Sequence, residues 1–126
     1  KEQLVHHSEA AFMLRLLPVY EEISLAEKEA SKIPDEGLKK GILLVLSKLR
    51  ASFEKDGLQE MKLEGEKFDP FRHEAAMHEE SDLPAGTIVR SIQKGYLFRG
   101  EVLRHAIVSV SSGKKTEEKQ AAEKKK

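Results

Sequence analysis

The chain has 126 residues, of which 35% are charged and 39% hydrophobic, with seven aromatic side chains and neither Trp nor Cys. This length suits one domain, or a small domain with an extended element, and so few bulky apolar residues favour an elongated or oligomeric protein. The lack of Cys excludes disulfides, thiolate metal sites and cysteine nucleophiles, and no apolar run approaches the roughly 20 residues that span a bilayer. We therefore predict a cytoplasmic protein with no signal peptide and no membrane partner.

The charges sum to zero but are unevenly distributed. From Lys114 onward the chain has six Lys and three Glu, so residues 1–113 carry a net charge of −3. A nucleic-acid-binding surface requires a basic folded face, and this balance predicts no nucleic-acid partner. Residues 113–126 contain no apolar side chain larger than Ala and are predicted to form a disordered charged tail.

Residues 1–33 are predicted to form a long helix with a coiled-coil-like seam. Apolar residues recur every seven positions, with others four positions later: Val5, Phe12, Val19 and Ala26, then Leu16, Ile23 and Ala30. One helix cannot bury such a seam, so a partner helix is expected, and Leu17 and Tyr20 widen the apolar stripe enough for a bundle. Pro18 is expected to kink the helix near Leu14.

Residues 35–56 are predicted to form a second helix. Pro34 and Asp35 suit a first helical turn, and Gly57 suits the position just after a helix. The apolar residues of this segment share one face: Leu38, Ile42, Val45, Leu49 and Phe53. We therefore predict that residues 1–57 are a helical dimerisation region, in which two αα-hairpins from a homodimer make a four-helix bundle.

A compact β-domain is predicted over residues 58–112, which makes the fold class α+β. Alternating apolar residues predict a hairpin over residues 91–110, in which Ala106, Val108 and Val110 share a face. The turn falls at Arg99-Gly100. A type I′ turn requires positive φ at both positions, which Arg resists, so a type I turn with a glycine bulge is expected.

The histidines offer no clear metal site. His73, Glu74 and His78 in "HEAAMH" resemble the zinc-protease pattern, but the spacing is one residue too long. On a helix the two imidazoles would lie about 140° apart, and on a strand they would point to opposite faces. We expect no cofactor, no metal and no enzymatic activity, and a metal-dependent hydrolase using these three residues is a minor alternative.

Two strings near the end, "GEKFDPFRHEAAMHEES" and "LPAGTIVRSIQKGYLFRGEVLRHAIVSVS", together resemble the carboxyl-terminal signature of the GrpE family, the nucleotide exchange factors of DnaK-type chaperones. Upstream, "LLPVYEEISLAEKEA" and "GILLVLSKLRASFEKDGLQEM" are similar to that family's helices. The resemblance implies a homodimer whose β-domain binds the nucleotide-binding domain of the chaperone. It further implies that binding stabilises the open form of that domain and accelerates ADP release, with no covalent step.

The resemblance also implies site residues. Partner contacts would come from Ile92, Lys94, Glu101, Arg104 and Val110. Dimer contacts would come from the two apolar faces, at Val5, Phe12, Leu16, Val19, Ile23, Leu38, Ile42, Val45 and Leu49. Core packing is an equally good interpretation of Ile92 and Val110, and backbone bending at Gly95 is a better interpretation of the Lys94-Gly95-Tyr96 segment than partner contact.

Three positions depart from the family pattern. Glu101 stands where the family usually has Arg, Arg99 replaces a turn Asn, and His105 stands where Pro is frequent. The charge reversal at residue 101 leaves open whether the positive charge has moved to residue 99 or the cognate chaperone differs.

Two further expectations concern the whole molecule. The rival to an exchange factor is a dimeric coiled-coil scaffold or adaptor that presents its β-domain to another partner. Because the helical seam is narrow and is broken by Pro18, the helices are expected to unfold before the β-domain on heating, which would allow thermosensing.

Overall fold

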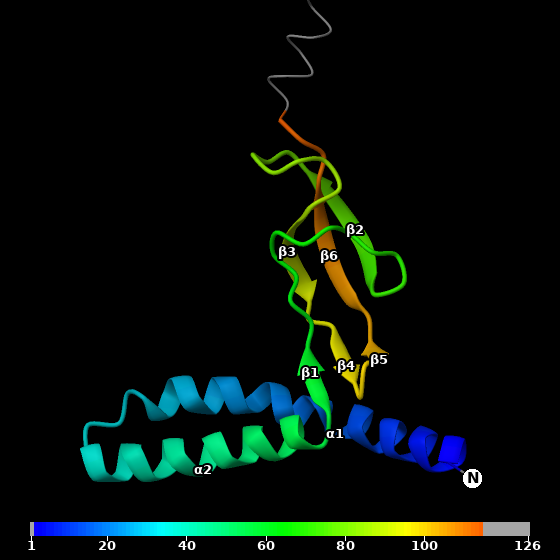
Figure 1. Cartoon of the computed structure of the whole chain (residues 1–126). Coiled ribbons are helices and arrows are strands. Elements are labelled where there is room, and N and C mark those ends of the chain that lie inside the picture. Colours follow the sequence, from blue (N-terminus) through cyan, green and yellow to red (C-terminus); the bar gives the residue numbers. More distant parts are fainter. Residues whose placement is uncertain (1, 115–126) are drawn as a thin grey trace, which may run out of the picture. The chain divides into compact units, whose positions relative to one another are not determined.

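The computed structural model describes residues 2–114, with side chains from Val5 onward. Two helices are followed by six short strands, so the fold is α+β, as predicted (Figure 1). The chain divides into two compact units. The helical unit comprises residues 1–59 with 98–103, and the β unit comprises residues 60–97 with the chain from Arg104 onward. The predicted division assigned all of residues 58–112 to the β-domain, whereas this grouping assigns the tip of the hairpin to the helices.

Helix α1 (Glu2–Ala30) buries one face within its own chain. The buried side chains recur at helical spacing and are Met13, Leu17, Tyr20, Ile23 and Ala30. The Tyr20 ring packs on Phe53 of the second helix, with ring centroids 5.4 Å apart. The helix continues through Pro18 without interruption. The buried face thus includes Ile23 and Ala30 of the predicted seam, whereas Val5, Phe12 and Val19 of the seam remain exposed.

Helix α2 (Glu36–Lys55) begins one residue later than predicted. Asp35 is its N-cap, and the Asp35 Oδ1 atom accepts a hydrogen bond of 3.1 Å from the Leu38 amide. Such caps satisfy an amide that has no partner within the helix. Gly57 follows the helix with φ of 110° and donates its amide to the Glu54 carbonyl, as predicted for a glycine ending.

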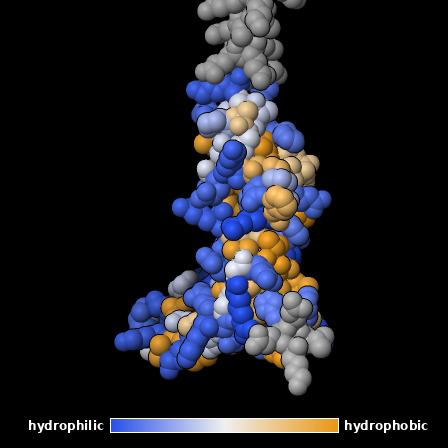
Figure 2. Space-filling view, turned by 45° about the vertical axis from the view of Figure 1, so that its right-hand side comes forward, coloured by the Kyte–Doolittle hydropathy of each residue, from blue (hydrophilic) through white to orange (hydrophobic). Residues whose placement is uncertain are grey.

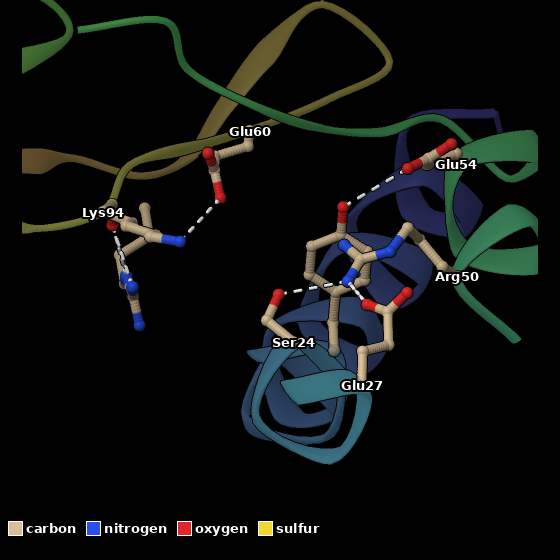
Figure 3. A network of polar contacts seen from close by, with 8 residues as sticks. Ser24, Glu27, Arg50, Glu54, Glu60 and Lys94 are labelled. Atoms are coloured by element: carbon tan, nitrogen blue, oxygen red, sulfur yellow. Dashed lines mark hydrogen bonds and ion pairs between the residues drawn. The ribbon is translucent and has the colours of Figure 1, made fainter. Parts of the chain in front are cut away.

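A polar network fixes the pairing of α1 with α2 (Figure 3). The Arg50 guanidinium forms an ion pair with Glu27, donates to the Ser24 hydroxyl at 3.0 Å and lies 5.5 Å from the centroid of the Tyr20 ring. The Tyr20 hydroxyl donates to Glu54 at 3.5 Å. Hydrogen bonding to Glu27 raises the pKa of Arg50. Because charged, planar and aromatic groups meet here in a fixed geometry, the network sets the register of the two helices.

Much of the core of the β unit is formed by a three-stranded sheet. Strands β2 (His73–Glu79), β6 (Ala106–Ser111) and β3 (Ile88–Gln93) lie in that order, with β2 parallel and β3 antiparallel to β6. Ala106, Val108 and Val110 alternate along β6 and are 0–4% exposed, and Ser109 and Ser111 between and beyond them are buried as well. The parallel β2–β6 pairing joins segments some 30 residues apart.

The predicted long hairpin is divided into two pairs of shorter strands. Strand β4 (Tyr96–Phe98) and strand β5 (Glu101–Arg104) leave the first sheet and form a second one with β1 (Leu58–Glu60), in the order β1-β4-β5. On one strand the break falls at Lys94-Gly95, and on the other it falls at His105.

Gly95 lies at the break because no side chain fits there. A Cβ atom on this residue would lie 2.6 Å from both the Ala106 backbone nitrogen and the Met61 sulfur. The Met61 amide also donates to the Gly95 carbonyl at 2.8 Å. The glycine is therefore required by the close approach of two backbones, which supports the interpretation that it serves bending and not partner contact.

The turn prediction at Arg99-Gly100 was wrong. The loop has two residues, and both have positive φ, 51° at Arg99 and 85° at Gly100, which is the pattern of a type I′ turn. Arg is unfavourable in this conformation. The Arg99 amide is held by a 2.9 Å hydrogen bond to the Gly57 carbonyl, and its Nε donates to the Asp56 carbonyl. Tertiary contacts therefore override the local preference.

Candidate partner-binding surface

Two of the predicted partner-binding residues, Lys94 and Arg104, lie together in the β unit. The Arg104 guanidinium donates twice to the Lys94 carbonyl, at 2.8 and 3.1 Å, and lies 5.2 Å from the centroid of the Tyr96 ring. The Lys94 ammonium forms a 3.2 Å ion pair with Glu60 (Figure 3). The Lys94 side chain remains about half exposed. Both cations are therefore held in defined positions, and Lys94 remains accessible to a partner.

The two apolar candidates differ in their exposure to solvent. Ile92, on β3, is 50% exposed. Val110, on β6, is only 4% exposed and packs in the core with Val108 and Ala106. The Val110 side chain therefore does not reach the surface, and core packing accounts for it. Ile92 and Lys94 are the accessible candidates in this part of the chain.

The fifth candidate, Glu101, belongs to the helical unit. Its carboxylate is 2.9 Å from the Nε2 atom of His6, on α1. The neighbouring turn residue Arg99 forms an ion pair with Glu9, also on α1. Both charged residues that depart from the family pattern thus have partners in their own chain.

Most of the predicted dimer residues form uncovered apolar surface on the helices (Figure 2). Six of them are 41–64% exposed: Val5, Phe12, Val19, Leu38, Val45 and Leu49. Leu16 and Ile42 are half-buried. Ile23 is only 2% exposed and is covered by its own chain, so its side chain is not available to a second copy. Helix α1 therefore buries one face within the chain, whereas α2 buries only Phe53, and both helices leave apolar side chains exposed to solvent.

A hollow of about 310 Å³ lies within the helical unit. Its apolar walls come from Phe12, Met13, Leu16, Phe53 and Phe98, and its polar rim comes from Glu9, Ser52, Asp56 and Arg99. Because Phe12 is also one of the exposed seam residues, the hollow is continuous with the uncovered face of α1.

The three residues of the hydrolase alternative do not assemble. His73 is buried and its Nδ1 atom accepts a 2.9 Å hydrogen bond from the Asp69 amide, whereas His78 and Glu74 are exposed. His73 thus ties the "FDP" loop to the start of β2 and is not free to bind a metal. Over residues 2–114, no cluster of three or more His, Cys, Asp or Glu could hold a metal ion.

Burial lowers the pKa of His73 below its ordinary value of 6.5. The unfolded chain therefore takes up a proton at higher pH than the folded protein does, so the free energy of unfolding should fall as the pH drops below about 6.5. His73→Asn would keep an acceptor for the Asp69 amide and remove the titration. Denaturant unfolding between pH 7.5 and 5 should give a shallower pH dependence for this variant than for the wild type. An identical dependence would show that His73 does not contribute.

Sequence reasoning missed His6, Glu9 and Glu60. In the sequence, His6 belongs to no recognisable motif, and Glu9 and Glu60 are ordinary surface carboxylates. Their partners, Glu101, Arg99 and Lys94, are 34 to 95 positions away in the chain. The three-residue spacing of His6 and Glu9 places them on one helical face, which is the single local signal for the pair.

The structure thus combines an αα-hairpin that has exposed apolar side chains on both helices with a β unit in which Ile92 and Lys94 are accessible. A family model described as GrpE matches residues 1–112. The chain belongs to the GrpE family.

The chain is similar to several curated proteins named Protein GrpE. It is 41% identical to that of Nitrosospira multiformis over 107 residues, which are 83% of this chain and 54% of the relative. It is 42% identical to that of Nitrosomonas eutropha over 106 residues, which are 83% of this chain and 53% of the relative. It is 34% identical to that of Methanothermobacter thermautotrophicus over 109 residues, which are 86% of this chain and 60% of the relative. The chain thus spans between half and three-fifths of these relatives.

In the part of the chain that the structure describes, neither helix is long and apolar enough to cross a membrane.

Proposed function

We propose that this chain is a co-chaperone that acts as the nucleotide exchange factor of a DnaK-type chaperone in the cytoplasm. The observation that carries the proposal is the match to the GrpE family over residues 1–112. Within the β unit, the proposed contacts are the exposed Ile92, the half-exposed Lys94 and the half-buried Arg104. Val110 is omitted because it is buried.

The proposed mechanism is differential binding. The β unit binds the open form of the nucleotide-binding domain more tightly than the closed form, so binding shifts the partner toward the form that releases ADP. Moving a two-state partner from 1:99 to 99:1 requires a differential of about 5.5 kcal/mol, which a protein interface of ordinary size can supply. The chaperone supplies the nucleotide chemistry, and this chain is not an enzyme.

The active form that we propose is a homodimer. The exposed apolar faces of α1 and α2 would pack against the same faces of a second copy and form a four-helix bundle. In water an exposed stripe containing Phe12, Val19 and Val45 is costly, and pairing removes it from solvent.

We further propose that heating unfolds the helical unit before the β unit and so reduces exchange. Few aliphatic side chains of α1 are buried within the chain, and its second apolar face depends on a partner. Helix content and exchange rate should therefore fall together on heating.

The proposal is tested by the release of fluorescently labelled ADP from a DnaK-type chaperone. The wild-type protein should accelerate release, and Ile92→Asp should reduce the acceleration by 10-fold or more, because a charge at an apolar contact is poorly tolerated. Phe71→Asp is a matched control, since Phe71 is 84% exposed and lies outside the proposed contact set. A dimer that binds another protein but has no effect on release at micromolar concentration would favour the scaffold.

A further inference from the structure

The hairpin tip, residues 98–103, belongs to the same compact unit as the helices. Its backbone is anchored just after α2, where the Arg99 amide donates to the Gly57 carbonyl at 2.9 Å. The Arg99 side chain donates to the Asp56 carbonyl at 3.2 Å and lies 4.7 Å from the centroid of the Phe98 ring. These contacts hold the base of the tip beside the end of α2.

Contacts with α1 hold the other side of the tip. Glu9 forms an ion pair with Arg99, and the Nε2 atom of His6 is 2.9 Å from the Glu101 carboxylate. The His6 ring also stacks on Phe98, with centroids 6.1 Å apart and an interplanar angle of 20°. His6 and Glu9 lie one helical turn apart on α1, and together they contact Phe98, Arg99 and Glu101 of the tip.

The polar groups at these contacts are complementary. The tip carries a cation at residue 99 and a carboxylate at residue 101, and α1 presents a carboxylate at residue 9 and an imidazole at residue 6. An Arg at residue 101 would meet the His6 ring, and an Asn at residue 99 would leave Glu9 without a cation. The two departures from the family pattern therefore fit the same face of α1.

We infer that His6 and Glu9 are positioning residues that hold the hairpin tip on α1, and that Arg99 and Glu101 serve this contact within the chain and not the contact with the chaperone. The tip connects β4 to β5, so the contact fixes the turn between the two strands that lead to Lys94 and Arg104. We call the contacts of His6 and Glu9 with the hairpin tip the latch. The consequence of the latch for chaperone binding rests on the proposed function, whereas the existence of the latch does not.

A double-mutant cycle of Glu9→Gln and Arg99→Met tests the latch in the free protein. Glu9→Gln removes a charge at constant size, and Arg99→Met keeps much of the side chain over Phe98. Amide hydrogen exchange of residues 98–103 should become about two- to five-fold faster in Glu9→Gln, the range expected for one partly exposed ion pair. In the Arg99→Met background, Glu9→Gln should have no further effect.

Two controls make this result specific. Glu22→Gln removes an exposed carboxylate from the same helix and should leave exchange of the tip unchanged. Exchange of the β6 amides should be equal in all variants. If Glu9→Gln leaves the tip unchanged, or has the same effect with and without Arg99, the latch is overturned.

The same variants then measure the consequence for binding. If the latch positions the tip, Glu9→Gln should weaken affinity for the nucleotide-binding domain two- to five-fold, and this effect should vanish in the Arg99→Met background. A coupled change in hydrogen exchange with no wild-type binding to the chaperone would contradict the proposed function and support the latch. Binding that Glu9→Gln weakens equally in both backgrounds would contradict the positioning role.

Discussion

Val19→Asp is expected to convert the proposed dimer to a monomer. Val19 lies at the centre of the predicted seam, and 46% of its surface is exposed. Burial of a Val side chain contributes roughly 1.5–3 kcal/mol, and a two-fold interface loses this contribution twice. The dissociation constant should therefore rise about 10²- to 10⁴-fold, before the added cost of burying a carboxylate. Analytical ultracentrifugation over a concentration series measures the change.

Leu25→Asp is the matched control for this experiment. Leu25 is 58% exposed on the same helix, but it lies about 120° around the axis from Val19. The control should keep the oligomeric state of the wild type. A monomeric wild-type protein, or equal dissociation of both variants, would contradict the assignment of the seam.

Gly95→Ala is expected to destabilise the β unit by about 3 kcal/mol. The added methyl group would lie 2.6 Å from the Ala106 backbone nitrogen and 2.7 Å from the Ala106 Cβ. The Met61 sulfur, also at 2.6 Å, could move, but the Ala106 backbone is held in β6. The melting temperature of the β unit should fall by roughly 10–20 °C. Unfolding followed by the methyl NMR signals of Val108 and Ile88 reports on this unit.

Gly41→Ala provides the comparison. Gly41 lies within α2, and a Cβ atom there would meet nothing within 4 Å. Ala is favoured over Gly in a helix by about 1 kcal/mol, so this variant should leave the unfolding of the β unit unchanged. If Gly95→Ala proved as stable as the wild type, the close approach of the two backbones would not be what requires glycine there.

The helices could be predicted from the sequence because their signals are local. The heptad repeat, the Asp35 cap region and Gly57 each act within one or two helical turns. The same repeat could not show which apolar face the chain would cover by itself. The choice between the seam of Val19 and the stripe of Leu17 depends on where α2 docks, and Ile23 falls on the covered side.

The β unit and the hairpin tip were less predictable because their determinants are non-local. Alternation identified the face shared by Ala106 and Val108, but not the parallel strand β2 beside it. At the turn, Arg99 adopts positive φ because Gly57 and Glu9, 42 and 90 positions away, hold it there. Pairings over such separations leave no periodic signal in the sequence.

Differential affinity is the central claim, and titration calorimetry with the nucleotide-binding domain of a DnaK-type chaperone tests it most directly. The protein should bind the nucleotide-free domain at least 100-fold more tightly than the ADP-saturated domain. By linkage, it should also weaken ADP binding by the same factor. Equal dissociation constants for the nucleotide-free and ADP-bound domains would contradict the account, because a ligand that binds both forms equally cannot shift their populations.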